Sequence, residues 1–110
     1  MILGDVHGKW SHFRDLCEKE FPDLVIQVGD FGWWPELDYK AKVDGETYIL
    51  SRIPTDMAEI RFCDGNHENH NSLYLIRSKN ENKKEPIQIR KNLYYHPRGN
   101  VWIHPNGLKF

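Results

Sequence analysis

The sequence lacks any long apolar run, and this lack limits the kinds of protein that it can encode. No stretch comes near the roughly 20 apolar residues that a membrane-spanning helix needs. The first residues, from Met1 to Asp5, contain neither a basic segment nor a long apolar one, so we expect no signal peptide. A chain of 110 residues is long enough for one small domain and too short for a two-domain enzyme.

Cysteine is also scarce, which limits the redox compartment and the class of metal that the protein can be expected to bind. Cys17 and Cys63 are the only two, and they form neither a CxxC pair nor the spacing of a zinc module. Both have apolar neighbours, so we expect buried, reduced thiols in a cytoplasmic protein. The shortage of thiols argues against a site for a soft metal.

The chain has little net charge, at -1, but the two signs are unevenly distributed. Residues 1–70 carry 7 basic and 14 acidic side chains, whereas residues 71–110 carry 8 basic and 2 acidic ones. An acidic segment suits a cation site, and a basic segment suits an anionic substrate or partner. Because aromatic residues are not regularly interleaved with the basic ones, the support for nucleic-acid binding is weak.

The hydrophobic pattern indicates an α/β layout. Helical periodicity predicts a helix over residues 9–21, with Phe21 on its apolar, core-facing side, ended by Pro22, and a shorter helix over residues 71–77. The β-branched run at 24–28 is typical of a strand buried on both faces. Residues 37–58 fit either a hairpin around Asp44-Gly45 or a short helix near Pro54. The other strands are predicted at residues 1–3, 60–63, 87–89, 93–95, 101–103 and 108–110.

Three of these strands end in a similar way, with glycine beside polar side chains. The motifs are GDVHG at residues 4–8, GDFG at 29–32 and GNHE at 65–68. Sites in open α/β sheets form beyond the carboxyl ends of the strands, so these motifs should meet in space. The side chains that this arrangement brings together are Asp5, His7, Asp30, Asn66 and His67.

These residue types suit a divalent metal such as Mn, Fe or Zn. Alternation along an extended chain places Asp5 and His7 on the same side, so one ion could bind both. The two oxygens of the Asp30 carboxylate could bridge that ion to a second one, to which Asn66 offers an amide oxygen.

The three motifs together resemble the signature of the calcineurin-like metallophosphoesterase superfamily, and GDVHG and GNHE look like its Ser/Thr protein phosphatase branch. The resemblance implies the N-terminal part of a two-sheet β-sandwich flanked by helices, and hydrolysis of phosphoesters by a hydroxide held between two divalent ions. It implies that Asp5 and His7 bind the first ion, Asp30 bridges both and Asn66 binds the second. His67 would then protonate the leaving group, and Glu68 would support the loop.

Two later motifs of the superfamily, an isolated His and Gly-His-x-His, do not occur in these 110 residues. We therefore expect residues 1–110 to form a metallophosphoesterase domain that is incomplete at its C-terminus, with a weakened second metal site. The alternative is a non-catalytic remnant that binds a metal or a phosphorylated partner without turnover. Substitute ligands would have to come from His70, His96 or His104, which are weak candidates.

The substrate stays open between a phosphoprotein, a nucleotide and other phosphoesters. In the Ser/Thr phosphatase branch the second motif continues with an Asp and an Arg, and the corresponding positions here are Trp33 and Trp34. Their rings could stack on a nucleobase or an aryl leaving group, or pack the loop onto the sheet. Arg98, in the turn after residues 93–95, could contact phosphate or serve the turn alone.

Overall fold

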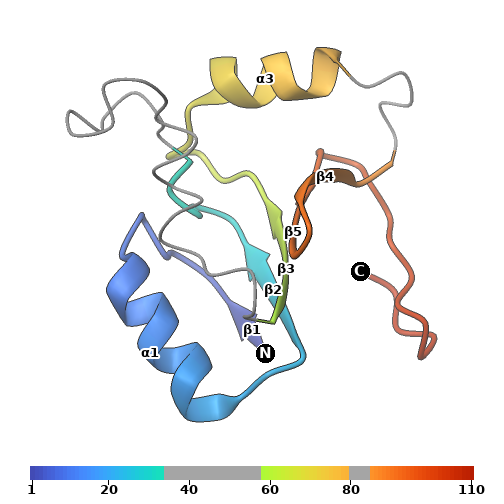
Figure 1. Ribbon diagram of the computed structural model, residues 1–110. Helices are drawn as coiled ribbons and strands as arrows, with labels where there is room; N and C mark the ends of the chain where they lie inside the picture. Colours follow the sequence, from blue (N-terminus) through green and yellow to red (C-terminus); the bar gives the residue numbers. More distant parts are fainter. Residues whose placement is uncertain (34–57, 80–84) are drawn as a thin grey trace.

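A computed structural model describes residues 1–33, 58–79 and 85–110, and its centre is a five-stranded sheet (Figure 1). The strand order is β1-β2-β3-β5-β4. β1, β2, β3 and β5 run parallel to one another, and β4 lies antiparallel at the edge beside β5. The strands are β1 (Ile2–Leu3), β2 (Leu24–Val28), β3 (Glu59–Cys63), β4 (Ile87–Arg90) and β5 (Leu93–His96).

Two described helices follow the sequence pattern closely. Helix α1 spans Trp10–Glu20, and helix α3 spans His70–Ser78, where the Asn69 side chain accepts a hydrogen bond from Ser72 N at 3.1 Å and caps the first turn. Phe21 ends α1 in a left-handed conformation, with φ of 47°, and its side chain is 84% exposed. The prediction that Phe21 belongs to the buried helical face is therefore wrong, because the chain leaves the helix at that residue.

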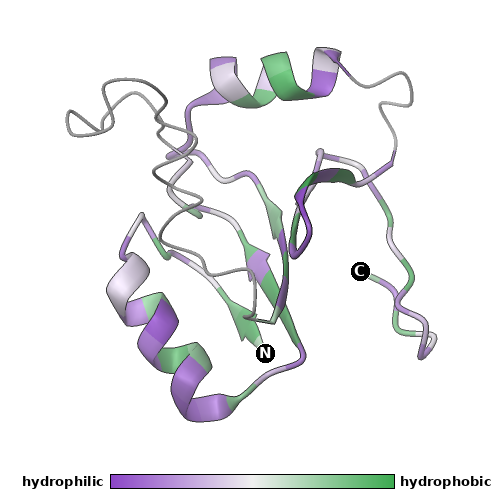
Figure 2. Cartoon of the chain, viewed as in Figure 1, coloured by the Kyte–Doolittle hydropathy of each residue, from purple (hydrophilic) through white to green (hydrophobic). Residues whose placement is uncertain are grey.

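One face of the sheet carries the hydrophobic core. The strand pairing places Val25 beside Ile60, and Ile60 beside Leu93, and all three are fully buried. Phe13 of α1 and Leu73 of α3 belong to the same buried cluster, so both helices pack on this face. Figure 2 shows mainly hydrophobic strands at the centre and alternating hydrophilic and hydrophobic segments along α1. This amphipathic pattern is the physical reason that both kinds of element form one layered unit.

The opposite face is only partly covered by the described residues. Val28 is 55% exposed there, so the prediction that residues 24–28 are buried on both faces is wrong. The strands predicted at 101–103 and 108–110 are reduced to one isolated bridge between Ile103 and Lys109. Reciprocal backbone hydrogen bonds between Trp102 and Phe110 nevertheless close this segment into a small hairpin.

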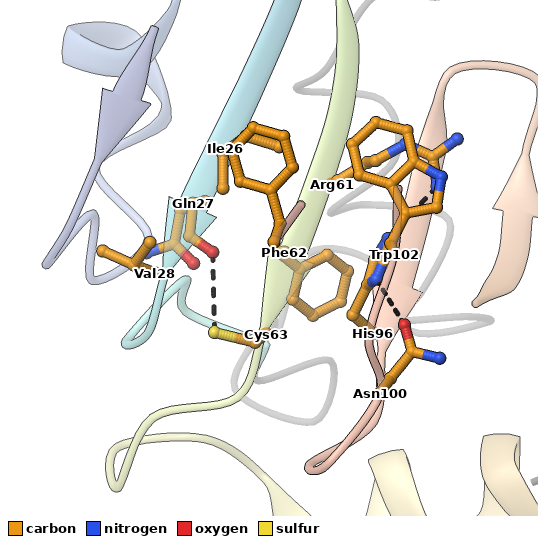
Figure 3. A pocket seen from close by; sticks show the side chains of 10 residues that line it. Ile26, Gln27, Val28, Arg61, Phe62, Cys63, His96, Asn100 and Trp102 are labelled. Atoms are coloured by element: carbon orange, nitrogen blue, oxygen red, sulfur yellow. Dashed lines mark hydrogen bonds between the residues drawn. The ribbon is translucent and has the colours of Figure 1, made fainter. Parts of the chain in front are cut away.

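That hairpin meets the sheet at a cluster that we call the face cluster, composed of Glu59, Arg61, His96, Asn100 and Trp102. Figure 3 shows the last four of these side chains. The Arg61 guanidinium carbon lies 4.1 Å from the centre of the Tyr94 ring and 3.8 Å from that of Trp102. Arg61 Nε donates to Glu59 Oε1 at 2.6 Å, and Arg61 Nη1 lies 3.1 Å from His96 Nε2. The stacking of Arg61 on Trp102 therefore holds the hairpin against the sheet, and the Glu59 carboxylate fixes the guanidinium within β3.

Two further predictions can be compared with the described part of the chain. Cys17 is buried, Cys63 is half-buried, and both are free thiols. In the described ranges, no helix is both long enough and apolar enough to cross a membrane. The alternatives for residues 37–58 concern positions that lie almost entirely outside the described residues.

Candidate metal centre

The loops that follow β1 and β2 run side by side beyond the ends of the strands. Asp5 N donates to Gly29 O at 3.2 Å, His7 N donates to Asp30 O at 2.7 Å, and Gly8 N donates to Phe31 O at 3.2 Å. These backbone hydrogen bonds continue the parallel pairing of the strands into the loops. As a result, the first two motifs lie next to each other at the carboxyl edge of the sheet, as the sequence predicts.

The backbone at this edge adopts unusual conformations. Asp5, His7 and Asp30 have φ angles of 51°, 49° and 52°, in the left-handed region. Of the other described non-glycine residues, only Phe21 at the end of α1 shares this property. Each such residue costs about 1–3 kcal/mol, and strain of this kind is typical of functional sites. The three strained residues are ones that the sequence predicts to be metal ligands.

Two glycines allow the loops to approach closely. A Cβ atom at Gly32 would lie 2.2 Å from Gly8 N, and one at Gly65 would lie 2.2 Å from Asp30 Oδ1. Neither neighbour can move away easily, because one is backbone and the other is a buried carboxylate held by hydrogen bonds. The glycines of the second and third motifs are therefore required by packing as well as by turning of the chain.

The three loops place His7, Asp30 and His67 around one point, and we call these residues the edge cluster. Each offers one ligand atom, and the three atoms lie within 4.8 Å of one another. His7 Nε2 is 3.6 Å and His67 Nδ1 is 3.1 Å from Asp30 Oδ2. The His7 and His67 side chains are 40% and 63% exposed, whereas Asp30 is only 11% exposed. The two rings are thus accessible from solvent, and the carboxylate lies beneath them.

Hydrogen bonds fix the charge of Asp30. The backbone N–H of His67 donates to Asp30 Oδ1 at 2.9 Å, and together with the His67 ring it holds the pKa of the Asp30 carboxyl below its usual value. Asp30 is therefore ionised at neutral pH, which a metal ligand must be. An ionised carboxylate only accepts hydrogen bonds, so the Nδ1 of His67 carries the proton that faces it.

Glu68 supports the second loop, as the sequence predicts. Its side chain is buried and accepts hydrogen bonds from the backbone N–H groups of Gly32 at 3.0 Å and Trp33 at 2.9 Å. Burial raises the pKa of the Glu68 carboxyl, while these backbone donors oppose the shift. The contact ties the GNHE motif to the loop that contains Asp30.

Trp33 packs inside the protein. It is fully buried, its ring stacks on Phe62 with 5.9 Å between ring centres, and its Nε1 donates to Ser72 Oγ at 3.0 Å. For Trp33, the alternative in which the ring packs the loop onto the sheet is confirmed. Trp34 lies outside the described residues.

One residue that supports the site has no recognisable motif. Gln27 is buried within β2, its amide nitrogen donates to Gly29 O, and its Oε1 accepts from Gly29 N at 3.1 Å. The side chain therefore holds the sharp turn that leads into Asp30. The available signal in the sequence is a polar residue inside an apolar run, since a buried amide needs partners.

The remaining predicted residues lie at the same edge. Asp5 is 81% exposed, and its Oδ1 is 3.5 Å from His7 Nε2. Asn66 is exposed in the loop after β3, next to His67. By contrast, His96 belongs to the face cluster, on the other face of the sheet. Two imidazoles and an ionised carboxylate fit a divalent ion of the Mn, Fe or Zn type; which residue has which role stays a prediction.

A family model for calcineurin-like phosphoesterases matches residues 1–108. The chain belongs to this calcineurin-like phosphoesterase family. No curated protein and no solved structure matches the chain. The mixed α/β fold, a sheet flanked by helices, agrees with membership of the metallophosphoesterases. Family membership indicates phosphoester hydrolysis with divalent metals in general terms, and the edge cluster provides a candidate ligand group for such a metal.

Proposed function

We propose that this metallophosphoesterase hydrolyses phosphoesters at a metal centre built on the edge cluster. The observation that carries the proposal is the meeting of side-chain atoms of His7, Asp30 and His67 within 4.8 Å, where the backbone of His7 and Asp30 is left-handed; His7 and Asp30 are the proposed ligands and His67 the neighbouring acid. The family match over residues 1–108 supports the same reaction class.

In this proposal Asp5 and His7 hold one divalent ion, Asp30 bridges it to a second, and Asn66 binds the second. The ions are Mn, Fe or Zn, and when bound they supply polarisation of the phosphoryl oxygens and a lower pKa for water. The exposed rings of His7 and His67 leave the centre open to a substrate from solvent.

His67 is the proposed proton donor. Asp30 fixes one proton on His67 Nδ1 and orients the ring. In the imidazolium form Nε2 carries a second proton, which can pass to the leaving-group oxygen. General acid catalysis of this kind contributes about 10²- to 10⁴-fold.

The test combines Mn²⁺ titration calorimetry with hydrolysis of an aryl phosphate monoester and an aryl phosphate diester. Asp30→Asn should lose both Mn²⁺ binding and turnover. His67→Ala should keep most of the Mn²⁺ binding but lose turnover by about 10²-fold or more, because it removes the proton donor. His104→Gln, in the C-terminal hairpin, is the matched control and should change neither.

The outcomes separate the proposal from its alternative. Mn²⁺ binding without turnover of either ester would favour the non-catalytic remnant. Failure to bind Mn²⁺ at millimolar concentration, with no effect of Asp30→Asn, would refute the site itself.

A further inference from the structure

Four parallel strands end at the carboxyl edge of the sheet, and the proposed machinery uses only three of them. Asp5 and His7 follow β1, Asp30 follows β2, and Asn66 and His67 follow β3. The fourth strand, β5, pairs in parallel with β3 and leads directly into a turn that contains Arg98. Because the carboxyl ends of parallel strands share one edge, Arg98 lies at the same edge as the metal centre.

Arg98 is joined to the third motif through Asp64, the residue before Gly65. Arg98 Nε donates to Asp64 Oδ2 at 2.6 Å, and Tyr95 Oη donates to Asp64 Oδ1 at 3.1 Å. The Asp64 side chain is only 4% exposed. Burial and the adjacent carboxylate raise the pKa of the Tyr95 phenol, so it remains a donor. Asp64 is thus a buried acceptor held by donors from β5 (Tyr95) and from the turn that follows it (Arg98).

The guanidinium of Arg98 has the opposite environment. Its side chain is 67% exposed, and within the described ranges its polar contact is with Asp64, through Nε. Within the described part of the chain, that contact uses Nε, so the Nη groups keep donors for a further anionic partner. The contact thus neutralises a buried carboxylate while most of the Arg98 side chain stays in solvent.

A second basic side chain lies beside the same carboxylate. His70 Nδ1, at the start of α3, lies 3.7 Å from Asp64 Oδ2, and its side chain is 48% exposed. Asp64 therefore gathers basic side chains next to Gly65 and Asn66, at an edge whose nearest motifs are rich in carboxylates. A positive group placed there favours an anionic oxygen of the substrate.

We propose that Arg98, positioned by Asp64, binds a non-bridging oxygen of a phosphate monoester at the metal centre. This inference rests on the proposed function. A planar guanidinium with two available Nη groups matches phosphate oxygens, and a lysine ammonium cannot reproduce that geometry. A monoester has a third non-bridging oxygen that a diester lacks, so the additional contact selects for monoesters. Asp64 is a positioning residue, because it acts only through Arg98.

The test measures the affinity of inorganic phosphate by calorimetry in the presence of Mn²⁺, and the KM and kcat for the two aryl esters. Arg98→Ala should weaken phosphate binding and raise the monoester KM by about ten- to a hundredfold, which is the value of a charge-assisted hydrogen bond. The KM for the diester and the Mn²⁺ affinity should change little, whereas the melting temperature should fall because the buried Asp64 loses its ion-pair partner. Arg98→Lys should restore only part of the phosphate affinity.

Lys91→Ala is the matched control, because it removes one exposed positive charge from the opposite end of β5. It should leave phosphate affinity unchanged. The inference is overturned if Arg98→Ala stays within about twofold of the wild type, if Lys91→Ala has the same effect, or if the diester KM rises as much as the monoester KM. Phosphate binding that depends on Arg98, in a protein that hydrolyses neither ester, would support this inference and refute the proposed function. Turnover that does not depend on Arg98 would support the proposed function and refute this inference.

Discussion

The edge cluster and the face cluster contain similar side chains, yet they are built in different ways. Each combines histidine with a carboxylate. In the face cluster, the His96 ring bonds Arg61 and Asn100, and aromatic rings cover the guanidinium. In the edge cluster, two histidine rings are exposed, and the backbone of His7 and Asp30 is strained.

The difference teaches which of the two is built to bind a ligand. Polar groups that satisfy one another beside aromatic rings stabilise the protein, even though Glu59 of the face cluster remains 40% exposed. Strained loops with accessible ligand atoms lower stability, and they persist where a function requires them. Residue type alone does not separate the clusters, because both contain histidine and acid. Exposure and backbone conformation do.

The largest expected effect comes from closing the space beneath Asp30. Gly65→Ala should weaken Mn²⁺ binding by about ten- to a hundredfold and cost about 1–3 kcal/mol of stability, because its Cβ would collide with the carboxylate and displace it. Calorimetry with Mn²⁺ and urea unfolding measure the two effects.

Gly107→Ala separates this collision from a general effect of replacing glycine. Its Cβ would meet no atom within 4 Å, but its φ of 95° is unfavourable for alanine. The variant should lose about 1–2 kcal/mol of stability and keep its Mn²⁺ affinity. If Gly65→Ala bound Mn²⁺ as tightly as the wild type, the edge cluster would not be the metal site.

A smaller effect is expected in the face cluster. Arg61→Ala should lower the free energy of unfolding by about 2 kcal/mol, because it removes the stacking on Tyr94 and Trp102 and the hydrogen bond to Glu59. Urea unfolding measures this loss, and Arg61→Lys should give an intermediate value. Mn²⁺ and phosphate binding should be unaffected; a change in either would mean that the two clusters are coupled.

The smallest effect concerns the pH dependence of stability. Burial lowers the pKa of the His96 imidazole below 6.5, the Asn100 hydrogen bond opposes this shift, and the charges that face the ring are Arg61 and Glu59. The unfolded chain therefore takes up a proton at higher pH than the folded protein does. The stability that neutral His96 contributes is fully present above the pKa of the unfolded chain. It is lost as the pH falls through the lower pKa of the folded protein.

His96→Gln tests that sign. Melting temperatures of the wild type and the variant, measured between about pH 8 and pH 5, should converge as the pH falls, because only the wild type carries this histidine. A difference that stays constant across the range would show that His96 does not titrate on unfolding.

Sequence patterns predicted local structure well where one rule acted alone. Helix α1, helix α3 and the strands up to β5 lie within one or two residues of their predicted bounds, because each has a clear hydrophobic period. The predictions failed where the outcome depended on distant residues. Val28 is exposed and residues 101–110 form a hairpin with one bridge, because strand pairing and burial depend on partners distant in sequence, which a local period does not report.

Local motifs also predicted most of the residues of the candidate site. Motifs at the ends of strands selected Asp5, His7, Asp30, Asn66 and His67, and the structure places all of them at one edge. The support given by Gln27 and the link from Asp64 to Arg98 were not predicted. Both depend on contacts that no local pattern encodes, and the second spans 34 positions of sequence.

The sequence by itself determined which residues are candidate metal ligands and that the strands bearing them end alike. Glycine, aspartate and histidine next to apolar runs specify that much through local sterics and coordination chemistry. The tertiary structure alone decided which histidines lie beside Asp30 and which arginine lies beside Asp64 at the edge of the sheet. Strand order is the reason: β5 pairs with β3, which brings Arg98 to Asp64 at the edge while His96 and Arg61 turn to the other face.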